Sequence, residues 1–111
     1  MAKERTLIRG IISLFILYVL LSEGEKHGYA LRKIIVNEFG DVPSGYIYVL
    51  LKHLQNKKCI TPYSKVINNR KVKVYRITEE GKRLLLEHKE MLRKCISVSE
   101  EILSKLEGSK L

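Results

Sequence analysis

The chain has 111 residues, of which 45% are hydrophobic and 30% are charged, and its formal net charge is +9. This length and balance exclude an intrinsically disordered chain and leave room for one domain with a core of its own. The apolar run over residues 10–21, twelve residues long, is too short for a membrane-spanning helix, which needs roughly 20.

Nearly all of the excess positive charge lies in one third of the chain. Residues 1–43 carry a net charge of +1, and residues 78–111 carry a net charge of zero. The window 44–77 contains no Asp or Glu, and its basic residues are Lys52, Lys57, Lys58, Lys65, Arg70, Lys71, Lys73 and Arg76. A solvated surface usually mixes both signs, so a segment of one sign indicates a polyanionic partner.

The first predicted element is a helix over residues 5–22. Its apolar run has charged residues on both sides and is followed by SEGEKHGY, which lacks the small-residue cleavage site of a signal peptide. Runs of about 10–14 apolar residues are more often buried core helices. We therefore expect a soluble, cytoplasmic protein whose first helix is buried nearly all round and ends at Gly24.

A second helix is predicted over residues 28–38 and a third from Ser44. The second ends at Gly40, before Pro43, and its apolar stripe consists of Leu31, Ile34, Ile35 and Phe39. Ser44 is a suitable N-cap, because its hydroxyl accepts from a backbone N–H of the first turn. The inward face of the third helix consists of Ile47, Leu50, Leu51 and Leu54. Two short helices joined by a tight turn have the layout of a helix-turn-helix.

From Cys59 the pattern predicts two strands, over residues 59–67 and 70–77. Both are rich in Val, Ile, Thr and Tyr, and the pair Asn68-Asn69 between them suits a two-residue hairpin turn. That turn aligns Ile67 with Arg70 and Ile60 with Ile77. Pro62 favours an edge position for the first of the two strands.

A long last helix is predicted from its N-cap Thr78 to about residue 107, with Glu79 and Glu80 in its first turn. Its apolar residues form two neighbouring seams. The first seam, which we expect to form a homodimer interface, consists of Leu84, His88, Met91, Cys95, Val98 and Ile102. The second seam, which we expect to pack on the first helix of the same chain, consists of Leu85, Leu92, Ile96, Leu103 and Leu106. The alternative is a single broad face within one chain.

Together these elements predict a mostly α (α+β) fold. It has a winged helix-turn-helix domain over residues 1–77 and a dimerisation helix over residues 78–111 that packs as one unit with the first helix. In such a fold the third helix enters the major groove of DNA, and the hairpin, or wing, follows the flanking backbone. The predicted outward positions of the third helix are Ser44, Gly45, Tyr46, Tyr48, Val49, Lys52, His53, Asn56 and Lys57. For Tyr48 the alternative is packing against the second helix.

Three motifs then occur in order: EGEKHGYALRKII (residues 23–35), SGYIYVLLKHL (44–54) and VYRITEEGKRLL (74–85). In these the chain resembles PadR-type transcriptional regulators, whose corresponding motifs typically read HGYEL, GTLYPAL and YYRLTEEG. The resemblance covers most of residues 17–86. It implies a winged-helix repressor that dimerises through its C-terminal helices with the first helix and binds an inverted repeat of double-stranded DNA.

The resemblance also implies that Tyr48 lies on the DNA-facing helix. The chain departs from the family pattern at Val49, usually proline, at Tyr46, usually a small threonine, and at Lys58, usually glycine. These departures leave any inherited base preference open. The predicted DNA-binding residues are Ser44, Gly45, Tyr46, Tyr48, Lys52, Lys57, Asn69, Arg70, Lys71 and Lys73.

Other kinds of site find little support. Cys59 and Cys95 match neither a disulfide framework nor a zinc site and fit free thiols, with an intermolecular disulfide as the alternative. His27 fits a structural or phosphate-side role better than a catalytic one, and the lone His53 fits simple exposure. No catalytic set, Gly-rich phosphate loop or metal cluster occurs in the sequence, so no catalysis, metal or cofactor is predicted. Some relatives bind aromatic or multidrug-type ligands between subunits, but this chain has no Trp for stacking, and its effector stays unidentified.

Two other functions compete with DNA recognition. A winged helix can serve as a protein–protein interaction module of a transcription assembly, without sequence-selective DNA binding. The first helix and the basic segment could instead attach the protein to a membrane surface, although the balanced charges beside that helix argue against this. We expect a double-stranded DNA partner and no membrane partner.

Overall fold

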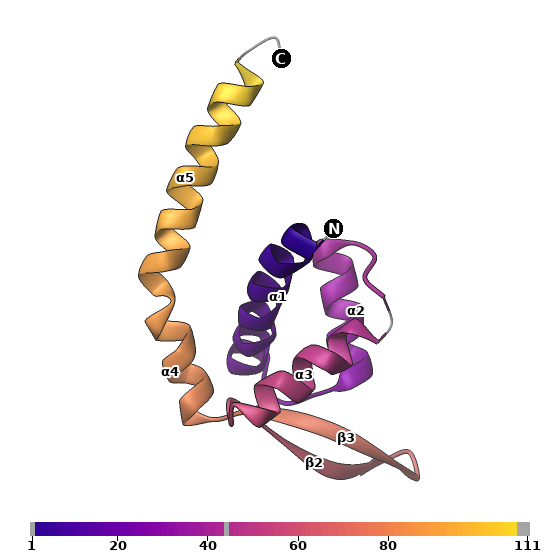
Figure 1. Ribbon diagram of the computed structural model, residues 1–111. Coiled ribbons are helices and arrows are strands. Elements are labelled where there is room, and N and C mark those ends of the chain that lie inside the picture. The colour runs from indigo at the N-terminus through magenta and orange to yellow at the C-terminus, as the bar shows by residue number, and fades with distance from the viewer. Residues whose placement is uncertain (1, 44, 109–111) are drawn as a thin grey trace.

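The protein is described by a computed structural model that covers residues 2–43 and 45–108. The expected N-cap Ser44 therefore lies outside the described residues. The elements follow in the order α1 (Ala2–Glu23), β1 (Lys26–His27), α2 (Gly28–Phe39), α3 (Tyr46–Asn56), β2 (Ile60–Ile67), β3 (Arg70–Ile77), α4 (Glu79–Glu87) and α5 (Lys89–Glu107). Figure 1 shows α1, α2 and α3 gathered into one body, with the β2–β3 hairpin, the wing, projecting from one side. The predicted winged helix-turn-helix fold is confirmed.

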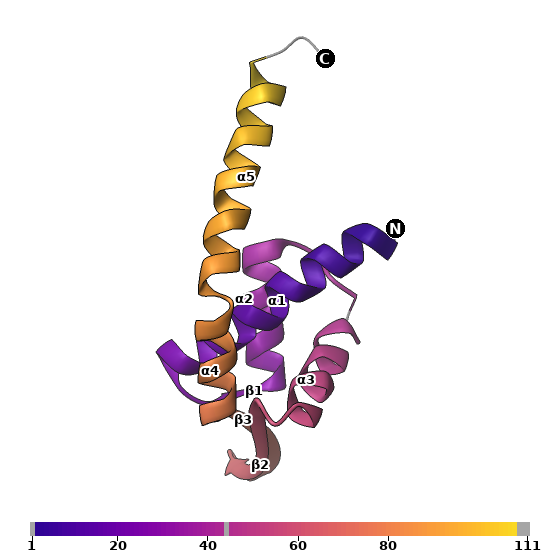
Figure 2. The ribbon, with the colours of Figure 1, turned by 60° about the vertical axis from the view of Figure 1, so that its left-hand side comes forward.

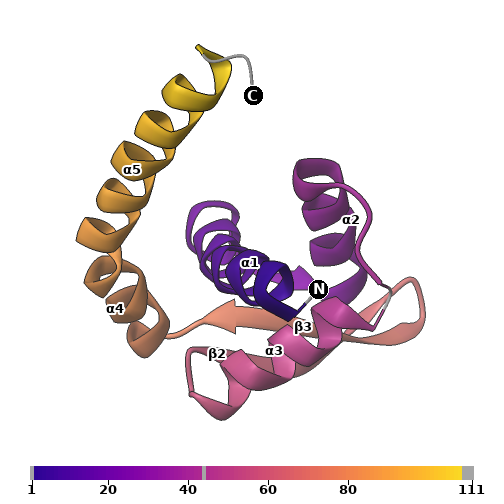
Figure 3. The ribbon, with the colours of Figure 1, turned by 45° about the horizontal axis from the view of Figure 1, so that its top comes forward.

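The core lies where α1, α2 and α3 meet the root of the wing, and α1 occupies the middle of this arrangement (Figure 3). Its side chains come from every one of these elements and include Ile16, Leu17, Leu31, Ile35, Ile47, Leu51, Ile60 and Tyr75. The expectation that α1 is buried nearly all round is wrong. One side of this helix is exposed and carries Ile8, Ile11, Tyr18 and Leu21.

Two glycines end the first two helices as predicted. Gly24 follows α1 with φ of +85°, and Gly40 follows α2 with φ of +88°. L side chains rarely adopt this left-handed conformation, whereas glycine adopts it at little cost. The turns that place α2 against α1 and lead into α3 are therefore encoded locally.

The sheet has the strand order β1-β3-β2 and is antiparallel throughout. The predicted register is confirmed, with Ile60 opposite Ile77 and Ile67 opposite Arg70. Asn68 and Asn69 both have positive φ, as a two-residue hairpin turn requires. Pro62 lies on an edge strand, as expected. The short strand β1 was not predicted, because two residues are too few to give a strand pattern.

The end of α3 is closed by a Schellman motif. The Cys59 N–H donates to the Leu54 carbonyl at 2.9 Å, and the Lys58 N–H donates to the Gln55 carbonyl at 2.9 Å. Lys58 has φ of +62° at the position of this motif that glycine usually occupies. The backbone is therefore strained at Lys58, the junction between α3 and the wing.

The predicted long C-terminal helix is present, and a break at His88 divides it into α4 and α5. Thr78 caps α4 as predicted, and its hydroxyl accepts from the Gly81 N–H at 3.1 Å. At His88 the backbone leaves the helical conformation (φ −92°, ψ 1°), and the imidazole Nδ1 lies 2.9 Å from the Leu84 carbonyl oxygen. A side chain that bonds a helix carbonyl competes with the regular backbone pattern. The break therefore separates α4 from α5.

The two parts of the divided helix differ in their packing. Helix α4 packs against α1, with Leu84 and Leu85 against the core cluster. Helix α5 has no buried residue within the described part of the chain and extends away from the body (Figure 2). The molecule is accordingly elongated, with principal extents of 58, 28 and 24 Å. None of the helices, over the ranges given above, is long and apolar enough to cross a membrane.

Candidate nucleic-acid interface

Helix α3 has a buried and an exposed face, as the sequence predicted. The buried residues are Ile47, Leu50, Leu51 and Leu54. On the other face Tyr48 and Val49 are 48% and 55% exposed, and Lys52 and His53 are also exposed. The inward prediction is confirmed, and the residues that remain outside are available to a partner.

Tyr48 lies at a recess of about 550 Å³ where the start of α2, the start of α3 and the wing come together. The recess is lined by His27, Gly28, Tyr29, Tyr48, Arg70, Val72, Lys73 and Tyr75. It combines a tyrosine hydroxyl, two cations and the positive end of the α2 dipole. Phosphate oxygens are bound by such groups, so the recess suits a polyanionic backbone.

The Tyr48 ring packs closely against the backbone of Gly28. A Cβ atom at Gly28 would lie 2.8 Å from Cε1 of Tyr48, closer than real Cβ contacts. Tyr48 thus packs against the second helix, which was the alternative considered from the sequence, and it is also half-exposed at the recess. The α2 end of this contact is held by His27, whose Nδ1 accepts from the Ala30 N–H at 3.1 Å.

Tyr46 does not lie on the outward face, so its predicted orientation is wrong. Its ring packs against the core cluster, and its hydroxyl oxygen is buried without a hydrogen-bond partner among the described residues. The Arg9 guanidinium carbon of α1 lies 5.7 Å from the ring centroid. The start of α3 therefore lies beside α1 here, and the next residue, Ile47, is fully buried.

The other predicted DNA-binding residues of α3 are spread along the helix. Gly45 is exposed at its start and has open space around its α-carbon, and Lys52 is exposed in the middle. Lys57 lies at the far end, beside Glu80 and Arg83 of α4, and does not line the recess. The structure therefore brings Tyr48 together with the wing but leaves Lys57 apart from them.

The predicted wing residues Asn69, Arg70, Lys71 and Lys73 are all exposed. Arg70 and Lys73 line the recess, whereas Lys71 borders a hollow with Pro62 and Ser64 on the wing itself. Within the described chain, the basic residues of the window 44–77 that form no ion pair are Lys52, Lys57, Lys58, Arg70, Lys71 and Lys73. These unpaired cations are available to phosphates.

The remaining two cations of the window are paired with Glu25, in the turn between α1 and β1. Lys65 Nζ lies 2.7 Å from Glu25 Oε2, and Arg76 Nε lies 3.0 Å from Oε1. Tyr63 also donates its hydroxyl to Oε1. The hydrogen bonds from Lys65, Tyr63 and Arg76 lower the pKa of Glu25 to about 2. We call these four residues the Glu25 cluster. Sequence reasoning missed it, because its contacts depend on the position of β1.

Tyr29, in the first turn of α2, also lines the recess, and sequence reasoning assigned it no role. Tyr29 is 58% exposed, and its ring is stacked on the His27 imidazole at a centroid distance of 6.5 Å. Lys33 Nζ lies 5.4 Å from the centre of the Tyr29 ring. The motif HGY carried the signal, since it places an aromatic residue in the first turn of a helix that faces the wing.

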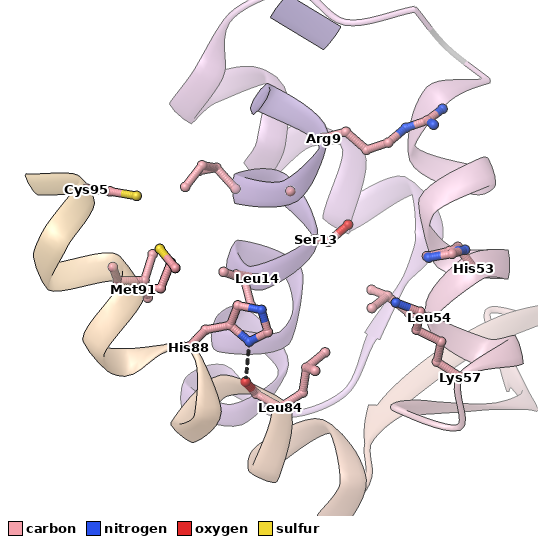
Figure 4. Close-up of a pocket in the computed structure, with 13 residues that line it drawn as sticks. Arg9, Ser13, Leu14, His53, Leu54, Lys57, Leu84, His88, Met91 and Cys95 are labelled. Carbon is pink, nitrogen blue, oxygen red and sulfur yellow. Dashed lines mark hydrogen bonds between the residues drawn. The ribbon is translucent and has the colours of Figure 1, made fainter. Parts of the chain in front are cut away.

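The residues of the predicted dimer seam lie in two different environments. Leu84, His88, Met91 and Cys95 line a groove of about 540 Å³ opposite Arg9, Ser13 and Leu14 of α1, whereas Val98 and Ile102 are exposed beyond it. Figure 4 shows α4 and the start of α5 on one side of α1, with His53 and Lys57 of α3 on its other side.

For the second seam, packing on α1 is confirmed only near its start. Leu85 packs on the core cluster and Leu92 lines the groove, but Ile96, Leu103 and Leu106 are exposed. The packing of these three residues on α1 was predicted wrongly, because α5 points away from α1 after the break at His88. The chain therefore has an apolar helix surface that its own core does not cover.

Metal-ligating side chains do not gather anywhere in the described ranges. No group of three or more His, Cys, Asp and Glu residues there could hold a metal ion. Cys59 is buried and Cys95 is exposed, and both are free thiols. Burial raises the pKa of the Cys59 thiol.

Comparisons with known proteins agree with this geometry. The model of the transcriptional regulator PadR-like family matches residues 16–87. A solved structure of a protein from Thermoplasma acidophilum, described as a transcriptional regulator, is 31% identical with a TM-score of 0.82, covering 89% of this chain and 96% of that one. A PadR-like transcriptional regulator from Bacillus cereus is 30% identical with a TM-score of 0.76, covering 88% and 96%. A PadR family transcription regulator from Clostridium difficile is 26% identical with a TM-score of 0.73, covering 83% and 97%. The search of curated proteins found no match.

Proposed function

The chain belongs to the PadR-like family of transcriptional regulators, and we propose that it is a repressor that binds an inverted repeat of double-stranded DNA as a homodimer. Family membership makes it a DNA-binding regulator of transcription, which agrees with the expectation that it is not an enzyme. The proposal adds the sign of regulation, the symmetry of the site and the oligomeric state. We place its action in the cytoplasm, where free thiols such as Cys59 and Cys95 persist.

One observation carries the proposal: the recess at Tyr48 lies between the start of the DNA-facing helix and a wing whose outer cations are unpaired. Arg70 and Lys73 line the recess, and Lys71 lies on the same wing. Side chains near the N-terminal end of a recognition helix are best placed to reach base edges, while cations on either side hold phosphates. In this arrangement Tyr48 contacts DNA, with Gly45 and Lys52 on the same helix. The wing residues Asn69, Arg70, Lys71 and Lys73 follow the backbone.

The homodimer is supported by the apolar surface of α5. Met91, Val98 and Ile102 of the predicted seam are more than half exposed, as are Ile96 and Leu103 beside them. A helix with this much apolar surface is seldom left uncovered in a soluble protein. A second copy supplies an equivalent helix, and a two-fold axis pairs two α3 helices with two half-sites.

The test is selection of bound fragments from genomic DNA with the purified protein. We expect a two-fold symmetric site with half-sites about one helical turn, ~34–36 Å, apart. If roughly 6–10 phosphates are contacted per dimer, affinity for that site falls by about three to five decades between 50 and 200 mM salt. A protein–protein module would yield no selected sequence, and a nearly flat salt response would contradict the electrostatic part of the proposal. A reporter gene placed behind the selected site then distinguishes repression from activation.

A further inference from the structure

The Glu25 cluster joins both strands of the wing to the helical body through one carboxylate. The turn that carries Glu25 follows α1 directly and precedes β1. In the β1–β3 register Lys26 is opposite Tyr75, so Glu25 comes next to Arg76 on the central strand. The carboxylate also receives donors from Tyr63 and Lys65, which lie on the far strand β2. One side chain of the body therefore binds both strands of the wing.

The wing has few other attachments beyond its root. All residues from Ser64 to Lys71 are exposed, including both sides of the turn. Strand β1 pairs with β3 only at Val74 and Tyr75. A two-stranded ribbon of this kind is free to twist and swing about its root unless a further contact holds it. The Glu25 cluster supplies that contact at the level of Lys65, where the exposed part of the wing begins.

The charge of Glu25 works against DNA binding. A carboxylate beside a phosphate-binding wing repels DNA, and it also occupies Lys65 and Arg76, two of the eight cations of the basic window. Glu25 therefore lowers the general attraction for nucleic acid. In compensation, the Glu25 cluster fixes the orientation of the wing, and with it the positions of the unpaired cations Arg70, Lys71 and Lys73.

We infer that Glu25 is a positioning residue for the wing, which sets the orientation of β2 and β3 relative to α3 and thereby favours selective over non-selective DNA binding. This inference rests on the proposed function for its DNA readout. Glu25 itself contacts no DNA; it acts through Tyr63, Lys65 and Arg76. The Tyr63 ring strengthens the arrangement, because the Arg76 guanidinium carbon lies 4.3 Å from its centre.

The decisive comparison is between Glu25→Gln and Glu23→Gln. Both variants remove one negative charge near the end of α1, but Glu23 is the last residue of that helix, and its one ion pair among the described residues is with Lys26, at 3.3 Å. Binding is measured to the symmetric fragment selected by the wild-type protein and to a duplex of equal length and scrambled sequence. For Glu25→Gln we expect the ratio of the two affinities to fall about tenfold, with scrambled-duplex affinity unchanged or higher. The released cations should steepen the salt slope by up to about 0.9 each.

A second variant separates position from charge. Tyr63→Phe removes one donor to Glu25, keeps the ring beneath Arg76 and leaves the net charge unchanged. We expect its affinity ratio to fall in the same direction, with an unchanged salt slope. Should Glu25→Gln and Glu23→Gln raise both affinities equally, Glu25 acts only as a charge and the inference is wrong.

A measurement without DNA keeps the inference independent of the proposed function. Amide hydrogen exchange in β2 and β3 should be faster in Glu25→Gln than in Glu23→Gln and the wild type, while exchange in α1 stays the same. Equal exchange in all three proteins would overturn the positioning role even if DNA binding is selective. Conversely, if no DNA sequence is selected, the proposed function fails while the exchange rates still report whether Glu25 holds the wing.

Discussion

The Tyr48 ring packs against the α-carbon of Gly28, so closely that a Cβ atom there would lie 2.8 Å from Cε1. Gly28 begins α2 and Tyr48 lies in the first turns of α3. The contact holds a half-exposed tyrosine upright at the recess beside the wing. Gly28 of α2, which has no side chain, thus determines how the Tyr48 side chain of α3 is oriented.

The first prediction concerns the two members of this contact. Tyr48→Phe keeps the ring on Gly28 and removes the hydroxyl, so affinity for the selected DNA should fall roughly fivefold, about 1 kcal/mol. Gly28→Ala should displace the ring and weaken binding at least as much, while the free energy of unfolding changes by less than about 1 kcal/mol. Fluorescence anisotropy and thermal unfolding measure the two effects.

The matched control for this pair is Gly10→Ala in α1, where an added Cβ meets nothing within 4 Å. It should leave DNA affinity unchanged. Full DNA affinity of Gly28→Ala would show that the position of the Tyr48 ring is unimportant.

The second prediction concerns the unpaired cations of the wing. Single changes of Arg70, Lys71 and Lys73 to Glu should weaken binding to the selected and scrambled duplexes by the same factor, because phosphate contacts carry no sequence information. Each should reduce the salt slope by about 1. Lys89→Glu on α5 makes the same charge change away from the recess and is expected to preserve the slope. A loss confined to the selected duplex would instead assign these side chains to base edges.

The third prediction tests the dimer seam. Met91→Glu and Ile102→Glu place a carboxylate on the predicted interface, where burial without a partner costs about 2 kcal/mol or more and raises the dimer dissociation constant at least roughly 30-fold. Light scattering coupled to size-exclusion chromatography measures the mass. Leu86→Glu serves as the control, since Leu86 is 71% exposed and belongs to neither seam. Dimers of unchanged stability in the first two variants would place the interface elsewhere.

The fourth prediction concerns the strained backbone at Lys58, with φ of +62°. Lys58→Gly should stabilise the protein by about 1 kcal/mol, because glycine removes the steric cost of the left-handed conformation. Lys57→Gly makes the same change of charge at φ of −81° and should destabilise the protein by about 0.5–1 kcal/mol. Chemical denaturation distinguishes these opposite signs. Equal effects of the two changes would mean that the conformation of Lys58 carries no strain.

The fifth prediction is a pH dependence of the Glu25 cluster. Its carboxyl has a pKa of about 2 in the folded protein, against 4.5 ordinarily. A lowered pKa stabilises the folded state above pH 4.5, and the contribution is lost as the pH falls toward 2. The hydrogen bonds with Glu25 raise the pKa values of Lys65 and Arg76, and burial raises the pKa of Tyr63, so these groups keep their protons throughout this range.

The measurement compares thermal unfolding of the wild type and Glu25→Gln at several pH values. The wild type should melt at the higher temperature at pH 7, and the difference should shrink between pH 4.5 and 2. Glu23→Gln controls for the general effect of acid. A difference that stays constant down to pH 2 would contradict the assigned ionisation of Glu25.

Much of the fold follows from local signals in the sequence. The stripe of Ile47, Leu50, Leu51 and Leu54 predicted the buried face of α3, and Asn68-Asn69 predicted the turn and register of the wing. The concentration of positive charge between residues 44 and 77 pointed to the partner. Periodicity, turn chemistry and charge are properties of neighbouring residues, so they can be read without coordinates.

Tertiary contacts decided what each surface residue does. Tyr46 and Tyr48 both looked outward-facing in the sequence, yet one packs against the core cluster and the other stands at the recess. The sequence by itself determined the helices, the hairpin and the positive charge of the candidate interface. Only the tertiary structure decided which cations are unpaired, because Glu25 meets Tyr63, Lys65 and Arg76 across 38 to 51 positions of the chain. Such pairings depend on how strands and turns come together in space, which no local pattern contains.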